Sequence, residues 1–145
     1  VMNCSKAARP MSGEIRDQRR HERLYLSTSE GIIGVFTHTG HRVDLEGRIV
    51  DISMGGLGLA LKKDGVQGVT KGDLLVLKKV SGNPYLRPMS NIVMRIRWVL
   101  YHETLDHVGC GCEFINIPQV YGLLIQQFIR AYCLKFNLSP KRALS

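Results

Sequence analysis

The chain has 145 residues, 44% of them hydrophobic, and a formal net charge of +8 at pH 7. This length suits one domain, and the apolar content excludes a disordered chain. No apolar run approaches the roughly 18 residues of a membrane-spanning helix, and no signal peptide is visible. The four cysteines do not resemble a disulfide framework. We therefore expect a cytoplasmic protein without a membrane span.

The positive charge is uneven, because residues 62–100 contain eight Lys and Arg against two Asp and Glu. A basic surface favours anionic partners, such as a nucleotide, a nucleic acid, an anionic lipid or an acidic protein face. Charge alone does not choose among them.

Residues 1–14 include Pro10 and Gly13 and show no periodicity, so they are predicted to form a flexible N-terminal arm. The next segment contains an arginine cluster, Arg19, Arg20 and Arg23. Its spacing suits one face of a helix, although an extended segment accommodates it equally well. The planar fork of Arg can bind a phosphate or the O6/N7 edge of guanine in a bidentate way. The alternative is a solvated basic surface.

From Leu24 to about Phe114, turn residues recur between short runs rich in β-branched, aliphatic and aromatic residues. This pattern predicts five to seven strands in an antiparallel barrel or sandwich. No alternation of strands with helices is visible, so a parallel α/β fold is not expected.

Strand alternation within residues 48–54 places Val50 and Ile52 on one face and Asp51 and Ser53 on the other. An Asp can accept from the N1–H and N2 amino group of guanine, and a Ser can bond a phosphate. Two glycines, Gly55 and Gly56, follow and permit close approach of a ligand. An ordinary strand end and turn is the alternative interpretation.

Alternation in residues 92–101 places Trp98 in the core with Ile96 and Leu100, while a rim position stacking on a base is the alternative. Cys110 and Cys112 are separated by one residue, whereas zinc ligands are usually separated by two to four. We expect both to be buried, with no metal and no cofactor. No catalytic signature is visible, so an enzyme is not expected.

Residues 119–134 lack Pro and predict a helix of about four turns, followed by a tail over residues 135–145. The helix is expected to cap one end of the barrel or to dock a partner. Its predicted apolar stripe consists of Val120, Leu123, Leu124, Phe128 and Ala131, widened by Ile125, Ile129 and Tyr132.

The order and spacing of the two polar motifs resemble those of the PilZ domain, the bacterial receptor module for cyclic di-GMP. The family motifs are R-x-x-x-R and [D/N]-x-S-x-x-G. They are matched here by Arg19, Arg20 and Arg23, and by Asp51, Ser53 and Gly56. The resemblance extends through residues 57–61, 97–99 and 108–114 to the C-terminal helix, and covers residues 15–134 as one PilZ domain.

This resemblance implies a mainly β fold, a six-stranded antiparallel barrel with a C-terminal helix. It implies a non-catalytic receptor whose N-terminal arm orders around the ligand and signals to a partner protein of unknown identity. The implied ligand-binding residues are Arg19, Arg20, Arg23, Asp51, Ser53, Gly55 and Gly56, with Gln18 and Trp98 as weaker candidates. One alternative is a protein-interaction adaptor that acts without ligand. A barrel that binds nucleic acid is less favoured, because no array of exposed aromatic residues is evident.

Overall fold

The computed structural model describes residues 23–63 and 68–139. Its elements, in chain order, are β1 (Leu24–Tyr25), the 3₁₀ helix η1 (Thr28–Glu30), β2 (Ile33–His38), β3 (Val43–Ser53), β4 (Gly56–Lys62), β5 (Leu74–Ser81), β6 (Ile92–Leu100), β7 (His107–Asn116) and helix α2 (Gln119–Lys135). The predicted N-terminal arm, residues 1–14, lies outside the described residues.

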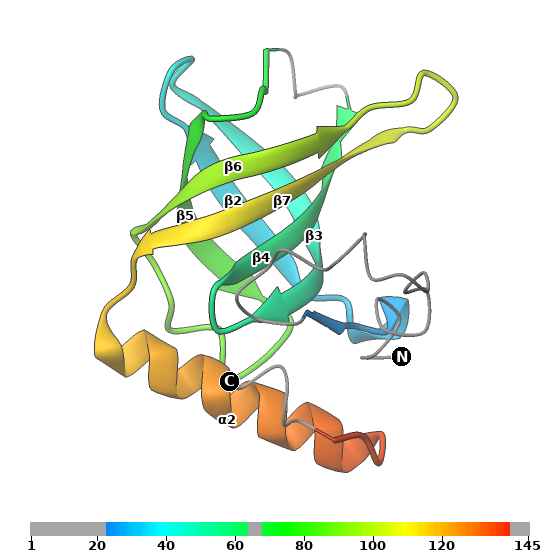
Figure 1. Ribbon diagram of the computed structural model, residues 1–145, viewed down its shortest axis with the longest axis vertical. Coiled ribbons are helices and arrows are strands. Elements are labelled where there is room, and N and C mark those ends of the chain that lie inside the picture. The colour runs from blue at the N-terminus through cyan, green and yellow to red at the C-terminus, as the bar shows by residue number, and fades with distance from the viewer. Residues whose placement is uncertain (1–22, 64–67, 140–145) are drawn as a thin grey trace, which may run out of the picture.

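Strands β2 to β7 form a closed antiparallel barrel (Figure 1). The order is β3-β2-β5-β6-β7-β4, and the pairing of β4 with β3 closes the ring. The two-residue strand β1 pairs with the end of β3, beyond the part of β3 that pairs with β2. The expectation of a mainly β, six-stranded antiparallel barrel with a C-terminal helix is confirmed.

Inward-facing aliphatic residues from all strands fill the barrel, as the buried Leu57, Leu59 and Leu61 of β4 illustrate. Full burial of each such side chain stabilises the fold by about 2 kcal/mol. No helix in the described part of the chain is long and apolar enough to cross a membrane.

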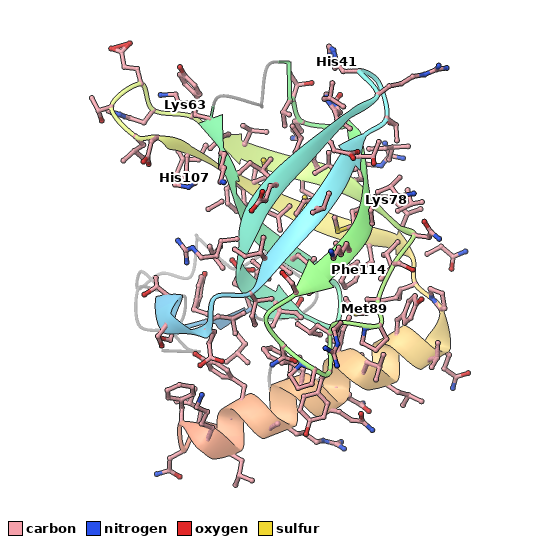
Figure 2. All side chains as sticks on the ribbon, turned by 180° about the vertical axis from the view of Figure 1, so that it is seen from behind. His41, Lys63, Lys78, Met89, His107 and Phe114 are labelled. Atoms are coloured by element: carbon pink, nitrogen blue, oxygen red, sulfur yellow. The ribbon has the colours of Figure 1, made fainter. Side chains whose placement is uncertain are left out.

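Helix α2 covers one end of the barrel, with Met89 beside it, while His41 lies at the far end (Figures 1 and 2). The prediction that α2 caps the barrel is therefore confirmed. The predicted apolar stripe is partly wrong, because Val120 and Leu123 are exposed. The side that faces the barrel consists of Ile125, Phe128, Ile129, Tyr132 and Cys133.

Two β-bulges interrupt the alternation that the sequence predicts. The first lies between Ile49 and Asp51, where β3 shifts register against β4. Because a bulge inserts one unpaired residue, Ile49 and Ile52 both enter the core, and Val50 does not. The expected pairing of Val50 with Ile52 on one face is therefore wrong, whereas Asp51 and Ser53 still alternate with Ile52.

The second bulge lies between Ile96 and Trp98, where β6 shifts register against β7. As a result, Val99 packs against the core and Trp98 turns outward with 40% of its surface exposed. The expectation that Trp98 and Leu100 line the core with Ile96 is therefore wrong.

A polar contact joins β2 to the start of β5. Nε2 of the buried His38 lies 2.9 Å from Oδ2 of Asp73, and the same carboxylate oxygen accepts from the backbone N–H of Thr70 at 3.0 Å. Burial alone would raise the pKa of Asp73, but these hydrogen bonds and the proximity of His38 outweigh it and lower the pKa below its ordinary value of 3.8. The carboxylate is thus stabilised in its charged form.

This lowered pKa predicts an acid-dependent loss of stability. A group whose pKa is depressed on folding contributes stability above its unfolded pKa, and that stability disappears as the pH falls through the folded pKa. We expect Asp73→Asn to be less stable than wild type above about pH 5, with the difference shrinking below about pH 4. Urea unfolding of both proteins across this range measures the effect, and a difference that is constant with pH would contradict it.

Candidate ligand-binding site

The two sequence motifs meet in an ion pair. Nη1 of Arg23 donates to Oδ1 of Asp51 at 2.9 Å, and both side chains are buried. The geometry follows from strand pairing, because Arg23 directly precedes β1 and the next residues, Leu24 and Tyr25, pair with Ile52 and Asp51 of β3. Nε of Arg23 is buried without a hydrogen-bond partner among the described residues. A buried donor left unpaired is costly unless an acceptor is supplied.

The second motif ends in the tight turn that joins β3 to β4. Oγ of the buried Ser53 accepts from the backbone N–H of Gly55 at 3.1 Å, and the carbonyl of Gly55 accepts from the N–H of Phe114 at 2.9 Å. A Cβ on Gly56 would collide with the carbonyl oxygen of Cys112. The hydroxyl and the glycines therefore hold this turn in place against β7.

A row of four residues crosses the outer face of the barrel from β3 to β6. Asp51 pairs with Gly58 of β4, Gly58 pairs with Gly111 of β7, and Gly111 pairs with Trp98 of β6. The Asp51 carboxylate lies over Gly58 and the Trp98 indole lies over Gly111, each where a Cβ would collide with it. A carboxylate and an indole thus approach the same pair of glycines from opposite sides.

A second row lies beside the first, formed by Arg48, Ala60, Gly109 and Leu100. Between β3 and β6, both rows carry nothing larger than a methyl group. We call Gly58, Ala60, Gly109 and Gly111 the small-residue strip. The flanking strands are about 14 Å apart, which is three strand spacings. Asp51 and Trp98 cover Gly58 and Gly111, which are buried, so the open part of the strip lies over the half-buried Ala60 and Gly109.

Sequence reasoning missed the strip and Arg48. The signal was present, because the central outward positions of β4 and β7 are Gly or Ala, while the inward positions between them are Leu59 and Cys110. It was not decisive without the pairing of β4 with β7, which sets Gly58 opposite Gly111.

The structure brings together Arg23, Asp51, Ser53, Gly55 and Gly56, and adds Trp98 at the far side of the strip. The predicted residues Gln18, Arg19 and Arg20 lie outside the described residues.

The cysteine pair lies on the other side of the same strands. Cys110 and Cys112 are buried in the core, and burial raises the pKa of the Cys110 thiol to about 12. Within residues 23–63 and 68–139, no cluster of three or more His, Cys, Asp or Glu side chains is arranged to hold a metal ion.

These features define a class of protein: a small β-barrel with an arginine-carboxylate pair beside a flat outer strip flanked by an indole. A guanidinium suits anionic oxygens, and a carboxylate and an indole suit the edge and face of a base. The PilZ domain family model matches residues 17–131, and the chain belongs to this family.

Solved structures share this fold. The PilZ domain of YcgR from Escherichia coli with c-di-GMP superposes with a TM-score of 0.65 at 14% identity, covering 83% of this chain and 95% of that one. The K. pneumonia MrkH–c-di-GMP complex superposes with a TM-score of 0.65 at 16% identity, covering 85% of this chain and 56% of that one. The Bacillus subtilis inhibitor of motility MotI/DgrA superposes with a TM-score of 0.56 at 16% identity, covering 88% of this chain and 56% of that one. No curated protein matches the sequence at a significant level.

The buried ion pair predicts a large cost for removing one partner. Asp51→Ala leaves the Arg23 guanidinium buried without its carboxylate, which we expect to cost about 3–5 kcal/mol of unfolding free energy. The double variant Arg23→Met, Asp51→Leu removes both charges and should be more stable than Asp51→Ala. Urea unfolding of the two variants measures the difference, and an Asp51→Ala protein as stable as wild type would contradict the pairing.

Proposed function

We propose that this protein is a cyclic di-GMP receptor that binds the dinucleotide on the small-residue strip and does not itself catalyse a reaction. The observation that carries the proposal is the Arg23–Asp51 pair set directly beside the strip. Its support is threefold: membership of the PilZ family, structural neighbours solved with this ligand, and a site chemistry that suits guanine and phosphate.

Each recognition element has a chemical counterpart on the ligand. Asp51 accepts from the N1–H and N2 amino group of one guanine, since a carboxylate offers about four lone-pair positions and can serve Arg23 as well. Arg23, with Nε unpartnered among the described residues, donates to a phosphate or to the guanine O6/N7 edge. Ser53 and the backbone at Gly55 and Gly56 complete this end of the site.

Trp98 supplies a stacking surface at the opposite end. Its indole lies against β7 over Gly111 and is partly exposed, so a guanine on the strip can contact its outer face. Arg48, in the second row, adds a guanidinium at the β3 edge of the strip.

Arg19 and Arg20 complete the site from the chain that precedes Arg23. They are at most four residues away, and an extended chain spans about 3.3–3.6 Å per residue, so both can reach the ligand beside Asp51. On binding, the predicted N-terminal arm, residues 1–14, orders around the ligand, and a downstream partner protein recognises this ordered arm. The protein acts in the cytoplasm of a bacterium.

A titration with cyclic di-GMP tests this proposal. Wild type should bind with micromolar or tighter affinity by calorimetry. Arg23→Lys keeps the charge opposite Asp51 but removes the bidentate fork, so affinity should fall by about tenfold or more. Arg19→Ala should weaken binding similarly without changing stability. Arg87→Lys, on the exposed connection between β5 and β6, is the matched control and should bind like wild type.

A folded wild-type protein that gives no heat with cyclic di-GMP would overturn the receptor proposal. If it also captures a protein partner regardless of the dinucleotide, the ligand-independent adaptor is the correct alternative. Affinity for DNA or RNA that falls steeply with salt would instead indicate a nucleic-acid binder.

The stacking role of Trp98 predicts a selective loss of affinity. Because Trp98 lies outside the core but covers Gly111, Trp98→Leu should lower the unfolding midpoint modestly and leave the protein folded. Loss of one base-stacking contact should reduce affinity by about 1–3 kcal/mol. Calorimetry measures the affinity. Tyr101 is an exposed aromatic residue in the β6–β7 loop, so Tyr101→Leu is the control and should bind cyclic di-GMP like wild type. Unchanged affinity in Trp98→Leu would place the base elsewhere.

A further inference from the structure

Helix α2 turns a regular stripe of exposed side chains away from the barrel. Its exposed positions alternate in steps of three and four residues, and we call them the outer stripe: Val120, Leu123, Gln127, Arg130 and Leu134. This spacing is that of a coiled-coil seam. Leu134 is 84% exposed and Leu123 is 51% exposed.

The composition of the outer stripe is not that of an ordinary solvated face. Such a face usually carries charged and polar side chains, whereas three of these five positions are apolar and α2 contains no Asp or Glu. Beside the stripe, Nζ of Lys135 lies 3.2 Å from Oε2 of Glu30. No described element covers this side of α2 (Figure 1). The stripe is thus a helix surface with leucines toward both ends and polar residues between them.

We propose that the outer stripe is a self-association surface, on which α2 packs antiparallel against α2 of a second copy of this chain. In one antiparallel alignment of the two helices, Leu123 of each copy lies opposite Leu134 of the other, so that a leucine pair forms at each end of the contact. The same alignment sets Gln127 opposite Arg130 in the two middle layers, where the amide oxygen of Gln127 accepts from the guanidinium. Polar layers within an apolar seam fix its register.

The stripe is self-complementary only in this orientation. A parallel pairing would set Arg130 against Arg130 and align the two helix dipoles, and both effects are unfavourable. The antiparallel pairing opposes the dipoles and uses the same patch on both copies, as an interface with two-fold symmetry requires.

The contact is small. A 17-residue helix is about 26 Å long, and one helix face buries less than the roughly 800 Å² per partner of a standard interface. Each copy also has a net charge of +8, so the copies repel one another. The dimer is therefore weak and reversible, and added salt strengthens it by screening the repulsion.

Sedimentation equilibrium over a concentration series tests the surface. Wild type should self-associate, and Leu134→Glu should weaken the association by about tenfold or more, since it buries a charge opposite Leu123. Leu105→Glu, at a 53% exposed leucine of the β6–β7 loop, is the matched control and should associate like wild type. A wild-type protein that stays monomeric at millimolar concentration would overturn the proposal, as would equal association of the two variants.

Disulfide trapping tests the orientation. In a Cys4→Ser background, where the remaining cysteines are buried, an equimolar mixture of Leu123→Cys and Leu134→Cys should form a mixed disulfide on mild oxidation. Neither variant alone should, because each position lies about 16 Å along the seam from its own counterpart, beyond the roughly 7 Å reach of a disulfide. Disulfides within each single variant, or none in the mixture, would overturn the antiparallel pairing.

Discussion

The ion pair between Arg23 and Asp51 is the interaction on which the candidate site depends. It joins the chain entering the barrel to the end of β3, at a point where β1 contributes only two paired residues. Since both groups are buried, removal of either would leave the other charge unpaired, and the pair fixes the position of Arg23. Arg23, the last residue of the arginine motif, therefore lies directly beside the small-residue strip.

The strip itself results from strand pairing. Glycines in strands are unfavourable, because they lose backbone entropy and pack no side chain, yet here two of them face one another across β4 and β7. A closed barrel with a continuous leucine-rich core can tolerate that cost. The glycines let the Asp51 carboxylate and the Trp98 indole lie close to the backbone, which any Cβ would prevent.

Both motifs are also attached to helix α2. The backbone N–H of Ser27, four residues after Arg23, donates to the Tyr132 hydroxyl at 2.7 Å, and Met54 in the β3–β4 turn lies against Gly122. Burial raises the pKa of Tyr132 above its ordinary value, so its hydroxyl stays protonated as a hydrogen-bonding group at neutral pH. The candidate site and helix α2 are therefore connected by direct contacts at Ser27 and Met54.

Sequence patterns were sufficient for the barrel, the C-terminal helix and the pairing of Asp51 with Ser53 on one face. They failed at Val50 and Trp98, because a β-bulge reverses which residues of a strand face the core. Where a bulge falls depends on the pairing with the neighbouring strand, which the sequence of one strand does not reveal. They failed at Val120 and Leu123 because an apolar residue on a helix does not reveal which side meets the barrel. They missed Gly58 and Gly111 because the significance of each glycine depends on the other.

We propose that the dinucleotide lies on the small-residue strip. An NMR titration of the ¹⁵N-labelled protein with cyclic di-GMP tests it most directly. We expect the largest shifts at the amides of Gly58, Ala60, Gly109 and Gly111 and at the indole N–H of Trp98. Shifts confined to another face of the barrel, such as the exposed lysines of β5, or no shifts at all, would contradict it.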